Sequence, residues 1–174
     1  MYLLGIDLET TGLNHKVDDI IEVGYVVWDT DKRSPVQMGG SLIKITSPLS
    51  PLIKDLTGIT DKQLSDFGRP IELVLGELAE VAKKCAYLVG HNAISFDRNF
   101  LSTAFKKQSI SFSDLPWIDT RTDVDYPKEM INRKLVYLAE KHGVLMQNAH
   151  RATFDVMMTL LILDKYHDKF SEIV

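Results

Sequence analysis

Acidic side chains end the first apolar run of this sequence, where they could bind metal ions. Asp7 and Glu9 close the segment YLLGIDLE and lie two positions apart. In a strand this spacing projects both carboxylates from the same face. Carboxylates at the end of a buried strand are unfavourable unless something pairs with them. Hard divalent cations such as Mg²⁺, which prefer oxygen ligands, are the natural partners.

Two later segments, GHNAISFD at 90–97 and HRATFD at 150–155, supply further chemical groups. Asp97 is expected in the first turn of a helix, where the helix dipole alone would account for an acidic residue. His150 and Asp155 are five positions apart, which is about 140° around a helix, so they cannot share one helix face. We therefore expect His150 in the loop before the helix and Asp155 in its first or second turn.

Together these residues predict a two-metal site for phosphodiester hydrolysis. All of them lie at the ends of predicted elements, so they converge if the first strand, the fourth strand and the last helix are neighbours. Such a cluster can hold two cations roughly 3.5–4 Å apart, which activate a water and stabilise the leaving oxygen. His150 can take the proton from that water, because histidine titrates near neutral pH.

The elements that must position these groups predict a single α/β domain over residues 1–174. Strands are expected at 2–8, 19–28, 38–46, 87–89 and 117–119, the first three as an antiparallel meander in a mixed five-stranded sheet. Helices are expected to open at Thr60 with a capping box and to cover 70–85, 94–107, 133–142 and 152–166. The segment 47–59, with two prolines and Gly58, is expected to be an extended loop.

Composition and charge exclude several classes of protein. The chain has 174 residues, 45% of them hydrophobic, and a formal net charge of −4. This balance argues against nucleic-acid binding through a broad basic surface and leaves contact with phosphate through metal ions. The single cysteine, Cys85, excludes internal disulfides and is expected to be buried. The first residues match neither a signal peptide nor a membrane span, so we expect a cytoplasmic location without membrane association.

The motifs IDLETTGL at 6–13, GHNAISFD at 90–97 and HRATFD at 150–155 resemble the three exonuclease motifs of the DnaQ-like (DEDDh) exonucleases. The resemblance runs to about residue 166 and includes DDIIEVGYV and LTGIT. It implies a ribonuclease-H-like fold with helices on both faces of the sheet, and removal of nucleoside 5′-monophosphates from 3′ ends. One departure is Phe154, where relatives more often carry a small or polar residue.

The same resemblance implies a role for each motif residue. Asp7, Glu9 and Asp155 would ligate two divalent cations, Mg²⁺ or Mn²⁺. Asp97 would contact metal mainly through a water molecule, and His150 would be the general base. The residues implied to contact the terminal nucleotides are Thr10, Thr11, Leu13, Thr57, Gly58, Ile59, Asn92 and Phe96.

Alternatives for the substrate and the partners remain open. LTGIT and GHNAISFD look more like the DNA-directed branch, which favours single-stranded DNA 3′ ends over RNA. The alternative enzyme is an oligoribonuclease or RNA 3′-end trimming enzyme, and a catalytically silent binding module is disfavoured because it has no reason to keep unpaired carboxylates together. A polymerase partner stays open, although the short segment after the last helix favours a stand-alone enzyme. We expect His91 to orient the second motif and His15 to be an exposed loop residue.

Overall fold

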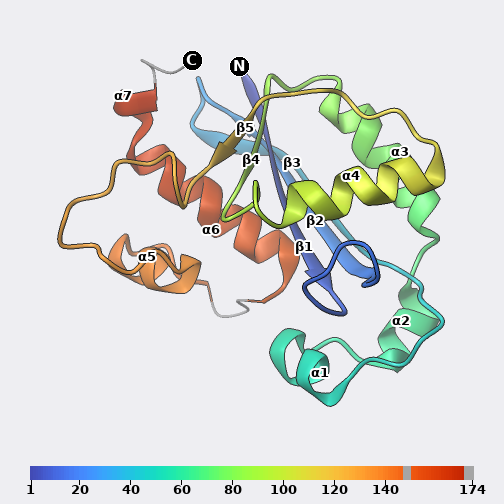
Figure 1. Cartoon of the computed structure of the whole chain (residues 1–174). Helices are drawn as coiled ribbons and strands as arrows, with labels where there is room; N and C mark the ends of the chain where they lie inside the picture. Colours follow the sequence, from blue (N-terminus) through green and yellow to red (C-terminus); the bar gives the residue numbers. More distant parts are fainter. Residues whose placement is uncertain (147–149, 171–174) are drawn as a thin grey trace.

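The computed structural model describes residues 1–146 and 150–170 and places a five-stranded sheet at their centre (Figure 1). The strands are β1 Tyr2–Thr10, β2 Ile20–Asp29, β3 Ser34–Leu42, β4 Tyr87–Gly90 and β5 Trp117–Asp119. Their order across the sheet is β3-β2-β1-β4-β5. The first three strands pair antiparallel, whereas β4 pairs parallel with both β1 and β5. The predicted mixed sheet, including its N-terminal meander, is confirmed.

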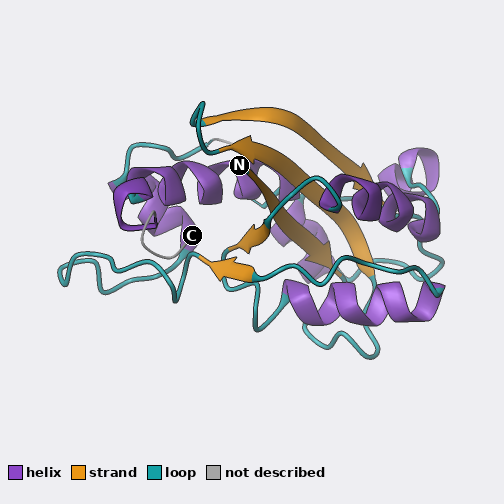
Figure 2. Cartoon of the chain, turned by 90° about the horizontal axis from the view of Figure 1, so that it is seen from above, coloured by secondary structure: helices purple, strands orange, loops and turns teal. Residues whose placement is uncertain are grey.

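Helices cover both faces of this twisted sheet (Figure 2). They are α1 Pro51–Thr57, α2 Asp61–Phe67, α3 Ile71–Ala82, α4 Asp97–Gln108, α5 Leu135–Lys141, α6 Ala152–Lys165 and α7 His167–Phe170. One core cluster joins the sheet to α3 and α4, and another joins its opposite face to α5 and α6. No helix among these residues is both long and apolar enough to cross a membrane.

Alternation along β1 decides which side chains reach which layer. Leu4, Ile6 and Leu8 are buried against α3 and α4, and each such burial stabilises the fold by roughly 2 kcal/mol. The intervening positions face α6, so Asp7 and Glu9 point toward that helix at the end of the strand. The strand therefore separates an apolar face from a face that carries the candidate chemistry.

Two glycines allow α6 to lie unusually close to the sheet. A Cβ atom added at Gly24 would lie 2.4 Å from the backbone carbonyl carbon of Ala152, and one at Gly5 would lie 2.6 Å from Val156 Cγ1. A backbone atom cannot move aside as a flexible side chain can. The first turn of α6 is therefore held directly over β1 and β2, close to the end of β1 that carries Asp7 and Glu9.

Two predicted elements need correction. The expected loop at 47–59 is wrong, because it contains α1: the Ser50 side chain accepts from Ile53 N, Pro51 begins the helix, and Gly58 ends it in the left-handed region at φ 68°. The third strand lies about four residues earlier than expected. Because β3 is an edge strand it tolerates Pro35, which lies before the predicted start of the strand at residue 38.

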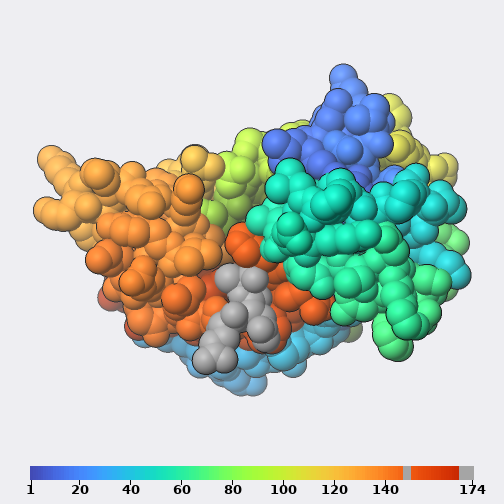
Figure 3. Space-filling view, turned by 90° about the horizontal axis from the view of Figure 1, so that it is seen from below, coloured from blue at the N-terminus to red at the C-terminus, as the bar shows by residue number. Residues whose placement is uncertain are grey.

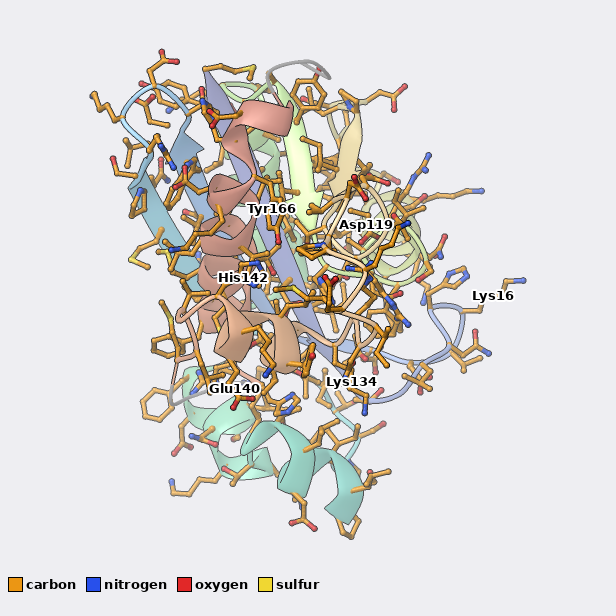
Figure 4. All side chains as sticks on the ribbon, turned by 90° about the vertical axis from the view of Figure 1, so that its left-hand side faces the viewer. Lys16, Asp119, Lys134, Glu140, His142 and Tyr166 are labelled. Carbon is orange, nitrogen blue, oxygen red and sulfur yellow. The ribbon has the colours of Figure 1, made fainter. Side chains whose placement is uncertain are left out.

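A histidine and a tyrosine fasten α5 to the far end of α6 (Figure 4). His142 Nδ1 donates to the Leu138 carbonyl at 2.7 Å, so its Nε2 accepts from the Tyr166 hydroxyl at 2.8 Å. Both rings pack edge-on against Tyr126. The sequence did not predict α7, whereas the expected burial of Cys85 is confirmed.

Candidate active site

Three carboxylates converge where β1 ends beneath the first turn of α6. Asp7 and Glu9 come from the face of β1 that points toward the helix, and Asp155 lies in the first turn of α6. One oxygen from each lies within 4.8 Å of the other two, a spacing that allows a shared metal ion. The convergence depends on the contact between α6 and β1 at Gly5.

Electrostatics in this cluster favour a bound cation. Burial, together with the neighbouring carboxylates, raises the pKa of Asp7 well above its usual value. Burial and the charges of Asp155 and Glu22 raise the pKa of Glu9 to about 8. Burial also raises the pKa of Asp155 to about 6, although the backbone N–H of His150 opposes that rise. Several half-buried carboxylates that repel one another are a donor set that fits a hard divalent cation.

Asp97 lies beside this group but is held differently. It begins α4, is 3% exposed, and its Oδ1 accepts from Leu8 N at 3.0 Å. Burial raises its pKa to about 7, and its charge contributes to the raised pKa of Asp7. The described carboxylates that could share one ion do not include Asp97. The expected contact of Asp97 with metal through a water molecule stays a prediction.

The turn before Asp97 is fixed by a buried carboxylate that the sequence analysis missed. Asp119, 2% exposed at the end of β5, accepts from the backbone N–H groups of Asn92 at 2.7 Å and Ile94 at 3.1 Å (Figure 4). These bonds hold residues 92–96 in a turn, so α4 begins at Asp97 rather than at the expected residue 94. The available sequence signal was an acidic residue closing an apolar strand, the same signal that marked Asp7.

His91 orients the same segment, as predicted. Its Nε2 lies 2.7 Å from the Arg133 carbonyl, to which it must donate. Its Nδ1 therefore accepts from the Thr120 hydroxyl at 2.9 Å. Burial lowers the pKa of His91, which agrees with a neutral ring bonded on both sides.

His150 is an exposed residue before α6, and Asp155 follows in the first turn, as the spacing predicted. The His150 backbone has φ 70°, in the left-handed region, and its N–H lies 3.3 Å from both oxygens of Asp155. Residues 147–149, which precede it, lie outside the described part of the chain. The base candidate thus enters the site from the same short segment as Asp155.

The loop between β1 and β2 is bonded into a fixed shape beside the cluster. Thr11 Oγ1 accepts from Asp19 N, and the Thr10 hydroxyl donates to the Gly12 carbonyl. His15 is half-buried, with Nδ1 2.7 Å from Thr103 Oγ1, so the expectation of an exposed residue is wrong. The loop presents Leu13 to solvent, with the side chain 87% exposed.

Helix α1 lies next to this loop (Figure 3), and here one expected substrate contact is wrong. The Ile59 side chain is 1% exposed and packs with a small core of α1, α2 and β2, so it is not available to a base. Thr57 is also buried, and its hydroxyl donates to the Ile53 carbonyl. Gly58 remains exposed, while Asn92 and Phe96 are half-buried across the site.

The surface above these residues is hollowed. Figure 3 shows a depression with the start of α6 at its floor. The loop between β1 and β2 and helix α1 flank one side, and the region of α5 flanks the other. Asp155 belongs to this first turn of α6, and Asp7 and Glu9 lie on the strand beneath it.

Comparisons with known sequences identify similar proteins. A profile of the RNase_T family, described as an exonuclease, matches residues 4–163. The 3′-5′ exonuclease DinG of Staphylococcus epidermidis is 32% identical over 170 residues, which cover 97% of this chain and 18% of that protein. DinG of Staphylococcus aureus is 31% identical with the same coverage. The chain therefore spans less than a fifth of the length of these curated relatives.

Solved structures with similar folds include two exonucleases. The zinc-bound E. coli ExoI–ssDNA complex gives a TM-score of 0.82 at 18% identity, covering 99% of this chain and 41% of that one. Exonuclease X in complex with 5′ overhanging duplex DNA gives 0.74 at 24% identity, covering 97% and 93%. At these identities the likeness concerns the fold, and it confirms the predicted ribonuclease-H-like arrangement.

Proposed function

This chain belongs to the RNase_T family of exonucleases, and we propose that it hydrolyses single-stranded DNA from the 3′ end, releasing nucleoside 5′-monophosphates. Residues 1–174 would act as one exonuclease domain. The predicted membership of the DnaQ-like exonucleases is confirmed by the family match. The observation that carries the proposed chemistry is the convergence of Asp7, Glu9 and Asp155 within 4.8 Å beside an exposed histidine.

Divalent cations complete the proposed site. Asp7, Glu9 and Asp155 would hold two ions, Mg²⁺ or Mn²⁺, with Asp97 contributing through water. When bound, the ions supply positive charge that polarises the phosphodiester and stabilises its leaving oxygen. The raised pKa values of Glu9 and Asp155 support this assignment, because burial beside other carboxylates leaves their negative charge in need of a partner.

His150 would act as the general base. Its place immediately before α6 keeps the imidazole next to Asp155 without placing it on the same helix face. The N–H bond from His150 to the Asp155 carboxylate fixes its backbone relative to the cluster. From there the ring can accept the proton of the attacking water, a contribution of about 10²–10⁴-fold for general bases.

The substrate would enter with its terminal base beside Leu13 and Phe96. Apolar contact and stacking at these side chains tolerate any base, and the exposed Gly58 at the end of α1 would also contact the terminal nucleotide. Duplex ends would have to fray first, at a cost of a few kcal/mol. The similar DinG proteins are named 3′-5′ exonucleases, which supports the direction of digestion. The similar structures of ExoI and exonuclease X hold DNA, which supports a DNA strand.

Digestion of end-labelled substrates tests this proposal. Single-stranded DNA and RNA of one sequence, each labelled at the 5′ end, are incubated with Mg²⁺ or with EDTA. Asp7→Asn serves as a matched protein that reveals contaminating nucleases. We expect a ladder that shrinks from the 3′ end with wild type and Mg²⁺ only. Cuts in a circular single strand would contradict exonuclease action, and immediate release of the labelled nucleotide would contradict 3′→5′ polarity. Faster loss of RNA would favour the RNA-trimming alternative.

A further inference from the structure

Glu22 on β2 lies next to the carboxylate cluster, yet its contacts go elsewhere. In the antiparallel register Glu22 is the direct partner of Glu9, so both side chains face α6. The Glu22 side chain is only 6% exposed. Its oxygens accept from Arg151 Nη2 at 2.7 Å, from Arg151 Nε at 3.1 Å and from Ala152 N at 3.1 Å. These three donor atoms belong to Arg151 and Ala152, the two residues that follow His150.

Through these contacts Glu22, a residue of strand β2, caps the N-terminus of α6 with its side chain. Ala152 is the first residue of the helix, and the preceding Arg151 makes no side-chain capping bond. The first N–H groups of a helix lack partners within it, and a carboxylate there is favoured by the dipole. Arg151 adds the opposite charge in a two-pronged, charge-assisted contact.

The same contacts hold the backbone of His150 in place. Its φ of 70° lies in the left-handed region, which costs energy for a residue other than glycine. Bonds on both sides fix this conformation: His150 N donates to Asp155, and the next two residues are bonded to Glu22. The segment could otherwise relax to an ordinary backbone angle and carry the imidazole with it.

We propose that Glu22 and Arg151 are positioning residues that fix His150 over the carboxylate cluster without touching substrate or metal. The inference rests on the proposed role of His150 as the base. Since Arg151 already neutralises Glu22, the glutamate is not left as a further ligand beside Glu9. The ion pair therefore separates a structural carboxylate from the catalytic ones in a crowded acidic site.

A second ion pair on the same helix provides a matched control. Arg33 donates to Asp164 at 3.0 and 2.9 Å near the opposite end of α6, also with two nitrogens. Both arginines are about half exposed, at 42% for Arg151 and 53% for Arg33. Arg33→Ala thus removes a similar contact far from His150 and should leave kcat within about twofold, since surface ion pairs act mainly on stability.

Kinetics on single-stranded DNA test the proposal. Arg151→Ala should lower kcat by about 10–100-fold, the usual effect of losing a group that orients a catalytic residue. KM and the Mg²⁺ concentration for half-maximal rate should stay nearly unchanged. Arg151→Lys should recover part of the rate, because it keeps one charged donor for Glu22. An Arg151→Ala rate equal to that of Arg33→Ala would overturn the proposal.

A double variant and hydrogen exchange separate positioning from general stability. If Arg151 acts through His150, adding Arg151→Ala to His150→Ala should cause no further loss of kcat; losses that multiply would contradict the proposal. Amide exchange at His150 should be at least about tenfold faster in Arg151→Ala than in Arg33→Ala. Without the ion pair to Glu22, the backbone around His150 would open more often. Unchanged exchange would overturn the positioning role even if the wild type proved inactive, whereas inactivity alone would refute the proposed function.

Discussion

Replacing Glu9 by glutamine should stabilise the metal-free protein at alkaline pH. Burial and the charges of Asp155 and Glu22 raise the pKa of Glu9 from 4.5 to about 8. The folded chain therefore binds more protons than the unfolded chain between these values, and wild-type stability falls as the pH rises from about 4.5 to about 8. Glu9→Gln removes the titrating group, so its stability should fall less over the same interval.

The magnitude follows from the pKa. One pKa unit corresponds to about 1.4 kcal/mol, so the full rise sets an upper limit of about 5 kcal/mol. Glu9 is partly exposed, and solvent screens the repulsion, so we expect a gain of about 2 kcal/mol at pH 8. For a domain of this size that is a rise in Tm of about 4–8 °C.

Thermal unfolding in EDTA at pH 5 and pH 8 measures the effect. The variant should exceed wild type at pH 8 and nearly match it at pH 5, where Glu9 is already protonated in the folded chain. The exposed Glu129 provides a control, because Glu129→Gln removes a charge away from the cluster. Added Mg²⁺ should stabilise wild type at pH 8 more than Glu9→Gln. A variant no more stable than wild type in EDTA at pH 8 would refute the inferred repulsion.

Three further substitutions test the other parts of the site. His150→Ala should lower kcat by about 10²–10⁴-fold while isothermal titration still detects metal binding; loss of both would mark His150 as a ligand. Asp119→Ala should leave the backbone N–H groups of Asn92, Ile94 and Arg121 without their carboxylate acceptor, destabilise the fold by about 2–4 kcal/mol in urea unfolding, and raise KM for DNA through the turn at Asn92. Gly24→Ala should push α6 from the sheet, lowering Tm and Mg²⁺ affinity together; an unchanged affinity would show that α6 does not position Asp155.

The parts of the site that follow local periodicity could be predicted from the sequence. Alternation placed Asp7 and Glu9 on one face of β1, and the five-residue spacing placed His150 before α6 and Asp155 in its first turn. Both arguments need only the geometry of a single element. The alternation of buried and exposed side chains is weaker at β3, because this strand lies at the edge of the sheet and contains two consecutive glycines. Its predicted boundaries were therefore displaced.

The supporting residues depend on contacts between distant parts of the chain, which local periodicity does not contain. Glu22 and Arg151 are 129 positions apart, and Asp119 is 27 positions from Asn92. An acidic residue at the end of a strand can face a cation, an arginine or a row of backbone N–H groups, and its sequence neighbourhood looks the same in each case. Only the register of β2 against β1 shows that Glu22 faces α6 beside Glu9.

Docking of the first turn of α6 links the stability of the fold to metal binding. Close contacts at Gly24 and Gly5 hold this turn against the sheet, while repulsion among Asp7, Glu9 and Asp155 opposes it. A cation that binds only the docked arrangement stabilises it by an amount that grows with the logarithm of the cation concentration, about 2.7 kcal/mol at a hundred times its Kd. Because the cation binds only the docked turn, a substitution that loosens the turn should weaken the apparent metal affinity by the factor by which it lowers the docked fraction. The close approach that creates the repulsion is therefore also what would allow the carboxylates to share a metal ion.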